Sequence, residues 1–315
     1  MNNNIQKGHI IIQCPAGQDC LDTGRHYADN QSAITACLNH KANKERMQRN
    51  SEYIQGNNYT TKDNPERNAE RLNRIVQDSK DCYDAADKIN SLISDNNNQP
   101  ITIETDFGQV SVKMASATIQ ERKNGKPIEH VVYEVDPEHS ADYFHNGQTY
   151  CYYETYVGKQ VTIDDTEDIK KARFAYITSD GKAGAYIKED GEFGGLFSAK
   201  KYKKEVAGAI IDTVMEYNGD EVDHLECFDT YLTGIYAKKG FHPVAHIPFD
   251  EQYAPEGWNY EEMEKYHHGK PPIMIMVHKD HMKQSAPDAY NYDNETSYDG
   301  DNISNIVKRA KGYIQ

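Results

Sequence analysis

The stretch from Leu225 to His278 constrains the fold of this chain most, because it alternates apolar segments with clear signals that end them. It opens at 225–228 with a compact apolar run, which is typical of a short strand. The segment 231–239 then places apolar side chains along one face of a helix. Gly240 follows directly, and glycine readily takes the left-handed conformation that ends many helices. The apolar residues of the helical segment are Leu232, Ile235 and Tyr236.

Two further strands complete the stretch. Apolar residues occupy alternate positions from Phe241 to Phe249, which is the period of a half-buried strand. The run from Ile273 to Val277 is apolar throughout. It is long enough for a buried strand and far too short to cross a membrane. The predicted order is therefore strand, short helix, strand and strand.

The residues before this stretch add a hairpin, a strand and a helix. Phe174–Thr178 and Ala183–Lys188 flank a Ser-Asp-Gly turn sequence and predict a β-hairpin. Phe193–Ser198 favours a strand, and the apolar residues of 200–217 recur at helical spacing. The whole order is three strands, a helix, a strand, a helix and two strands.

This order resembles the closing part of the GNAT acyltransferase fold. The motif Tyr236-Ala-Lys-Lys-Gly-Phe241 resembles the aromatic-x-x-x-Gly-Phe signature at the end of that fold's fourth helix. Asp229 and the segments 253–258 and 269–271 resemble additions found in a subgroup of phage and mobile-element proteins. The resemblance covers roughly residues 172–280, about a third of the chain.

The resemblance implies a binding site for acetyl-CoA. In GNAT enzymes two adjacent strands splay apart after a bulge, and the gap admits the pantetheine arm; here the strands would be 193–198 and 225–228. Gly194 and Gly195 suit close approach of the cofactor, but equally a bulge or a tight packing contact. The implied cofactor-binding residues are Leu196, Phe197, Ser198, Lys203 and Lys204.

The resemblance also implies catalytic roles. Tyr236 matches the family tyrosine that protonates the leaving thiolate, and a phenol with a pKa of about 10 suits that acid role. Alternatively, Tyr236 is a core residue that contributes to the apolar face of the short helix. Glu192 could act as the base for an incoming amine, with Glu226 and Asp229 as weaker candidates. The alternative for each carboxylate is a place on the surface.

One segment departs from the family pattern. The family's phosphate loop reads Gln/Arg-x-x-Gly-x-Gly/Ala, and here the glycine positions hold Lys204 and Val206. The chain also carries a net charge of −15, which argues against a direct grip on nucleic-acid phosphates. Two functions therefore stand. The first is an acyl-CoA-dependent N-acyltransferase acting on an amine. The second is an inactive GNAT-like scaffold that is virion-associated or binds a host factor, for example as an acidic inhibitor that mimics nucleic acid.

The predicted fold class is α+β. Four regions are expected, and the second, residues 100–170, can include the opening elements of the GNAT-like domain. Within the second region, Pro137–His145 favours a short helix and Tyr150–Tyr156 a strand, because aromatic residues are frequent in strands. The regions are a polar helical part (1–99), a β-rich section (100–170), the GNAT-like domain (171–280), and an acidic, tyrosine-rich tail ending in a short helix packed on its own protein (281–315).

No metal site is predicted. His242 and His246 are four residues apart, but on a strand their side chains would lie roughly 13 Å apart. The cysteines form no CxxC pair. With no leader or membrane-spanning stretch expected, the predicted location is the cytoplasm, of a host if the protein is phage-encoded, or a virion. The expected partner is an amine substrate or a host or phage protein, and the oligomeric state stays open.

Overall fold

The computed structural model describes residues 64–120, 125–154, 156–199, 204–282, 295–297 and 300–312, with four two-residue strands nearer the N-terminus. The chain divides into two compact units, Met1–Thr60 and Thr61–Gln315. In the first unit, β1 (Ile5–Gln6) pairs antiparallel with β2 (His9–Ile10), and β3 (Ile12–Gln13) with β4 (Asp19–Cys20). The rest of the helical region predicted before residue 64 lies outside the described residues.

The second unit is a mixed α+β fold, as predicted. The segments predicted as strands or helix between residues 174 and 278 are observed within a few residues of their expected bounds. Its α-helices and strands are α2 (Pro65–Asp78), α3 (Cys82–Asp95), β5 (Ile101–Thr105), β6 (Gly108–Gln120), β7 (Ile128–Val135), α4 (Ala141–Glu154), α5 (Thr166–Ile169), β8 (Phe174–Thr178), β9 (Ala183–Ile187), β10 (Phe193–Ser198), α6 (Lys204–Asn218), β11 (His224–Phe228), α7 (Tyr231–Ala237), β12 (Phe241–Ile247), β13 (Ile273–His278) and α8 (Gly300–Ala310).

Short 3-10 turns connect several of these elements. They are η1 (Tyr156–Gln160), η2 (Gly219–Glu221), η3 (Glu251–Tyr253), η4 (His267–Gly269) and η5 (Lys279–His281). No helix among the described residues is both long and apolar enough to cross a membrane.

Local sequence explains the start of the second unit. Asn64 caps α2 by accepting the backbone N–H of Arg67 at 3.0 Å, and Pro65 fits the first helical turn, where its missing N–H costs nothing. Asp81 caps α3 in the same way, accepting the N–H of Asp84. Both helices bury an apolar face on the sheet that follows them.

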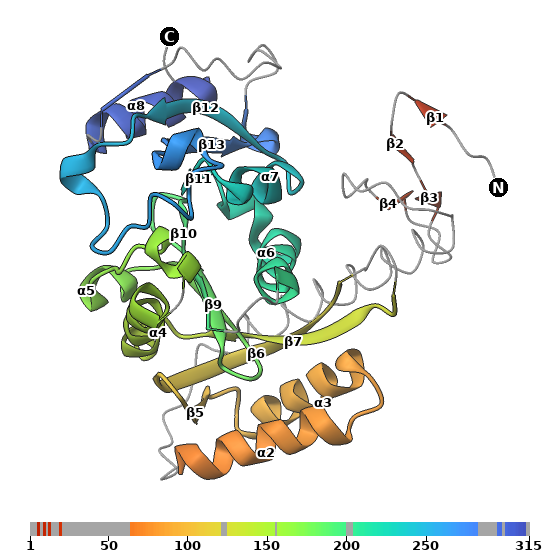
Figure 1. Cartoon of the computed structure of the whole chain (residues 1–315). Coiled ribbons are helices and arrows are strands. Elements are labelled where there is room, and N and C mark those ends of the chain that lie inside the picture. The colour runs from red at the N-terminus through yellow and green to blue at the C-terminus, as the bar shows by residue number, and fades with distance from the viewer. Residues whose placement is uncertain are drawn as a thin grey trace. The chain divides into compact units, whose positions relative to one another are not determined.

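Six strands form an antiparallel sheet in the order β10-β9-β8-β7-β6-β5. One face carries α2, α3 and α4, and the other carries α6, so that the sheet lies between two helical layers (Figure 1). Each face has its own apolar cluster, the first centred on residues such as Tyr143 and Phe144 and the second on residues such as Ile210 and Val214. The strands on both sides of residue 170 belong to this one sheet.

A second, smaller sheet has the order β11-β13-β12 and is also antiparallel. The terminal helix α8 covers it, with Ile303 and Val307 buried against Ala245, Ile275 and neighbouring residues. The prediction of a terminal helix packed on its own protein is therefore confirmed.

Among the described residues, the two sheets share a single backbone bridge. Glu192 and His224 form an isolated parallel bridge, and the N–H of Asp223 donates to the carbonyl of Gly191 at 2.9 Å. Beyond this bridge β10 and β11 share no ladder in the described part of the chain, so each presents one strand edge to the gap between them.

The predicted strand Tyr150–Tyr156 is wrong. Residues up to Glu154 belong to α4, which begins at Ala141. Tyr143, Gly147 and Cys151 recur every four residues on the buried face of this helix. Tertiary packing of that face on the sheet therefore overrides the strand preference of the aromatic residues.

Candidate functional site between the two sheets

The glycine pair of β10 marks a bulge at the gap. The pairing of β10 with β9 shifts register between Gly194 and Phe197. Gly195 has a φ of +64°, and a Cβ placed on it would lie only 2.1 Å from the ring of Tyr186. The glycine is therefore required both by its backbone conformation and by an aromatic ring that lies against it. The predicted alternatives of bulge and tight contact are both observed.

Tyr186 is held in place by a buried network. Its hydroxyl donates to the carboxylate of Asp164, and the side-chain amide of Gln148 donates to the same hydroxyl at 3.2 Å. Gln148 also accepts the backbone N–H of Asp164 at 3.0 Å. Burial and the Asp164 carboxylate raise the pKa of Tyr186, so the phenol stays protonated. The bulge is thus supported by a rigid polar anchor.

A group of charged side chains lies beside this anchor. The ammonium of Lys188 is 3.0 Å from both carboxylate oxygens of Glu192, which is half-buried before β10. Across the gap, burial and the charge of Glu192 raise the pKa of Glu226 to about 7, against the opposing effect of Lys188. A carboxyl group with a pKa near neutrality is suited to proton transfer. Sequence reasoning gave Glu226 less weight than Glu192.

An open pocket of about 320 Å³ adjoins these side chains. Carboxylates dominate its lining, so it suits a positively charged group. The lining residues are Asp164, Asp168, Lys171, Tyr186, Lys188, Glu189 and Asp190.

Tyr236 occupies a different environment. It is 6% exposed on α7, and its ring contacts Phe193 edge-on at a centroid distance of 6.3 Å and Phe241 at 6.1 Å. Burial raises its pKa, so the phenol is protonated at neutral pH. No hydrogen bond joins Tyr236 and Glu192 among the described residues: the ring of Tyr236 contacts Phe193, whereas Glu192 pairs with Lys188.

The predicted cofactor-binding residues divide into three kinds. Phe197 is fully buried against Gly147 of α4 and turns away from the gap. Leu196 is half-buried in the second apolar cluster, and the Ser198 hydroxyl is enclosed with no hydrogen-bond partner among the described residues. Lys203 lies outside the described residues, and Lys204 is the first residue of α6, with its side chain not described.

Asp229, a weaker sequence candidate, serves the aromatic loop instead. Its carboxylate lies 2.7 Å from Nε2 of His267. The nearby Trp258 donates its indole N–H to the carbonyl of Gly269 at 2.9 Å and packs against Phe228 with the rings tilted by 40°. The loop after β12 is therefore fastened to the end of β11.

The bridge between the sheets gathers a possible ligand set that sequence reasoning missed. Asp190, Glu192 and His224 each offer one atom, and these atoms lie within 4.8 Å of one another. Burial lowers the pKa of His224, so its imidazole is neutral near pH 7. The spacing of these three residues in the sequence does not indicate a metal site, because β10 and α6 separate His224 from the two carboxylates. The prediction of no metal site was based on His242 and His246 and did not consider this group.

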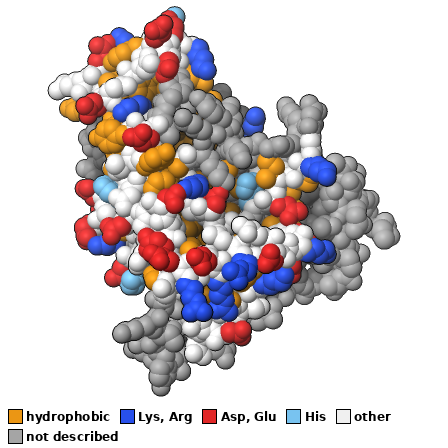
Figure 2. All heavy atoms as spheres, turned by 60° about the horizontal axis from the view of Figure 1, so that its bottom comes forward, with side chains coloured by type: hydrophobic (Ala, Val, Ile, Leu, Met, Phe, Trp, Pro, Cys, Tyr) orange, Lys and Arg blue, Asp and Glu red, His pale blue; other side chains and the backbone are white. Residues whose placement is uncertain are grey.

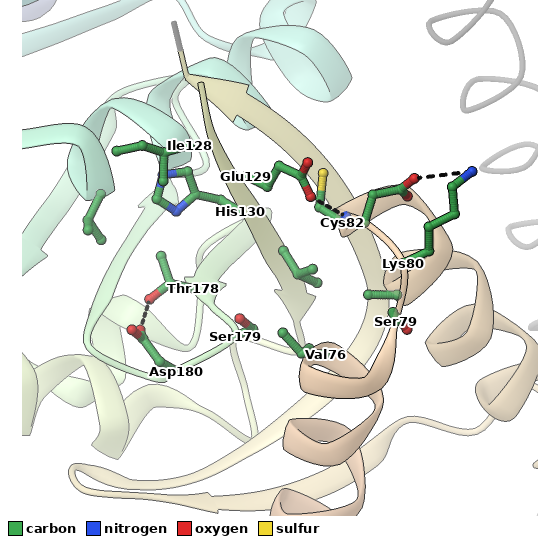
Figure 3. A pocket seen from close by; sticks show the side chains of 14 residues that line it. Val76, Ser79, Lys80, Cys82, Ile128, Glu129, His130, Thr178, Ser179 and Asp180 are labelled. Atoms are coloured by element: carbon green, nitrogen blue, oxygen red, sulfur yellow. Dashed lines mark hydrogen bonds and ion pairs between the residues drawn. The ribbon is translucent and has the colours of Figure 1, made fainter. Parts of the chain in front are cut away.

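A larger pocket, of about 490 Å³, lies away from the gap, between the α2–α3 junction and β7. Figure 3 shows Cys82, Glu129 and His130 among its lining residues. The Cys82 backbone N–H donates to Glu129 at 2.8 Å, and burial together with Glu129 raises the pKa of the Cys82 thiol to about 12. A thiol that holds its proton so firmly is a poor nucleophile, so this pocket offers no cysteine chemistry.

Charge is unevenly distributed over the surface. Figure 2 shows lysine and arginine side chains gathered on part of the face that carries α2, among acidic side chains. Arg67, Arg71 and Arg74 form an exposed stripe along α2 at helical spacing. The negative net charge therefore does not describe every face of the protein.

The chain matches no protein-family model and no curated protein. Among the described residues, the gap between β10 and β11 combines free strand edges, a bulge and groups able to move a proton.

Proposed function

We propose that this protein is a GNAT-like acyltransferase that moves an acyl group from acyl-CoA to an amine. The observation that carries the proposal is the arrangement of β10 and β11. These two strands are joined by one bridge at their N-terminal ends and by no ladder beyond it. Such a gap, after a bulge in the first strand, is what the GNAT resemblance requires for the pantetheine arm.

The order of the elements supports the same proposal. Strands β8, β9 and β10 are followed by α6, β11, α7, β12 and β13, which is the order expected from the resemblance. α7 ends before Gly240, whose φ of +95° is the left-handed conformation expected after the aromatic residue of the signature.

The cofactor would lie along the free edge of β10. Its pantetheine arm would bond to backbone groups at Leu196–Ser198, and its pyrophosphate would lie at the start of α6, where unpaired N–H groups and the helix dipole favour anions. Lys203 and Lys204 are placed in sequence to add positive charge there. They would replace the backbone contacts that the family's glycines allow.

Two groups would carry the proton transfers. Glu226 is the better base, because Glu192 is paired with Lys188 whereas Glu226 has no ion-pair partner among the described residues. Glu226 would take a proton from the amine as its nitrogen attacks the thioester carbonyl. The C–N bond forms, the C–S bond breaks, and Tyr236 would protonate the departing thiolate. The acidic pocket that Lys188 and Asp190 line suits an amine that is cationic in solution, such as a lysine side chain or a polyamine. This amine loses one proton to solvent before its neutral nitrogen attacks.

Calorimetry of the full chain with acetyl-CoA tests binding. We expect one molecule to bind, and release of free thiol when a cationic amine is added. Replacing Glu226→Gln should lower kcat by about 10²-fold or more with little change in acetyl-CoA affinity, because it removes only the base. Glu261→Gln, at an exposed position, is the matched control. Absence of acetyl-CoA binding at millimolar concentration would exclude the proposal.

A second function is favoured by the burial of Tyr236 within an aromatic core and by the lost loop glycines. In this alternative the fold is an inactive scaffold, virion-associated or bound to a host factor such as a nucleic-acid enzyme, and the net charge of −15 provides the attraction. It predicts a protein partner recovered from host lysate at low and moderate salt, together with no response to acetyl-CoA. Recovery of no partner in both conditions would count against it.

A further inference from the structure

Three potential metal ligands converge where β10 and β11 meet. Asp190 lies in the turn after β9, Glu192 directly precedes β10, and His224 is the first residue of β11. The parallel bridge between Glu192 and His224 fixes their backbones side by side. One ligand atom from each of the three residues lies within 4.8 Å of the others.

The three ligand atoms are nearly as close to one another as they would be around a bound ion. Ligand atoms held at about 2.1 Å by a tetrahedral ion lie about 3.4 Å apart. Closing the group around an ion therefore needs a movement of about 1.4 Å or less. Asp190 is exposed, so rotation of its side chain can supply part of this movement.

His224 provides an independent observation. The residue is only 6% exposed, and its Nδ1 is enclosed without a hydrogen-bond partner among the described residues. Buried polar side-chain atoms nearly always have a partner. The described residues therefore supply no hydrogen-bond partner for Nδ1 of this buried imidazole, whose ring offers a nitrogen within 4.8 Å of two carboxylates.

We propose that Asp190, Glu192 and His224 bind one divalent transition-metal ion. One imidazole nitrogen with two carboxylates suits Zn²⁺ or Mn²⁺, with water completing the coordination on the exposed side. The Lys188 ammonium contacts both oxygens of Glu192, so the metal ion and the ammonium compete for this carboxylate. The site does not depend on acyl transfer and can exist in either of the two functions above.

Zn²⁺ titration of the metal-free full chain by calorimetry tests the site. We expect His224→Ala and Asp190→Asn each to weaken one binding event by about tenfold or more, because each removes a ligand. Lys188→Met should strengthen the same event, since the competing cation is gone. His268→Asn, at a side chain that is 93% exposed and outside the trio, should leave it unchanged.

The test does not depend on the folding of His224→Ala. Asp190 is on the surface, and asparagine keeps the oxygen that accepts the Glu192 backbone N–H at 3.1 Å, so Asp190→Asn should fold even if His224→Ala does not. Co²⁺ in place of Zn²⁺ should give visible absorption bands that Asp190→Asn changes. Equal Zn²⁺ affinity and equal Co²⁺ spectra for the wild type and Asp190→Asn would overturn the proposal.

Discussion

The large and small sheets of the second unit are held together in different ways. In the six-stranded sheet every strand pairs with its neighbour through a ladder, whereas among the described residues a single backbone bridge joins this sheet to the three-stranded one. The apolar cluster around α6 and α7 supplies the rest of the attachment, because it contains side chains from both sheets. Backbone hydrogen bonds therefore build each sheet, and side-chain burial joins the two. This arrangement leaves strand edges free at the joint without separating the sheets.

The largest expected effect comes from Phe193→Ala. Phe193 faces the joint and contacts Tyr236, so its loss should cost about 3–5 kcal/mol of unfolding free energy. Phe197→Ala is the matched variant, because Phe197 lies on the same strand but is buried against α4. Chemical denaturation should give similar losses for both.

Hydrogen exchange then separates these two variants. We expect Phe193→Ala to lower amide protection in β11, β12 and β13 more than in β6 and β7, because it loosens the joint. Phe197→Ala should instead lower protection around α4 and β9. Identical exchange patterns in the two variants would show that the sheets are not held as described.

A smaller effect is expected from Gly195→Ala at the bulge. The new Cβ would clash with the Tyr186 ring and must adopt a φ of +64°, so we expect a loss of about 1–3 kcal/mol. Gly234→Ala in α7 is the control, since no atom lies within 4 Å of the added Cβ. That change should stabilise the protein by about 0.5–1 kcal/mol. Thermal unfolding that ranks the two variants the other way would contradict the role of the bulge.

The smallest effect concerns a carboxyl group inside the large sheet. Burial raises the pKa of Glu134 on β7 above its ordinary value, although Lys113 at 3.3 Å opposes this. The folded state then holds the proton more tightly than the unfolded state. The stability that the proton on Glu134 contributes is therefore fully present below the pKa of this group in the unfolded chain. It is lost as the pH rises through the pKa of the group in the folded protein.

Glu134→Gln tests the sign of this effect. Glutamine does not titrate, so the wild type should lose stability relative to Glu134→Gln between about pH 4 and pH 7. Denaturant midpoints of the two proteins across that range measure the difference. A wild type that gains stability relative to the variant over the same range would show that Lys113 outweighs burial.

Local pattern was sufficient for much of the fold. The β8–β9 hairpin and the Gly240 stop were both predicted from adjacent residues, because turns, helix ends and apolar period depend on neighbours in the sequence. The strand predicted at Tyr150–Tyr156 failed because α4 gains its stability from a buried face on a distant sheet. The GNAT resemblance and the acyltransfer site remain predictions.

The candidate site shows the same division more sharply. By itself the sequence determined that a glycine-containing strand, a helix and a second strand follow one another, and it marked Glu192 and Tyr236 as chemical groups. Only the tertiary structure decided that Lys188 pairs with Glu192, that Glu226 has a pKa near neutrality, and that His224 joins two carboxylates. The reason is physical. Secondary structure follows from short-range spacing, whereas ion pairing, burial and ligand geometry arise where strands distant in the chain meet.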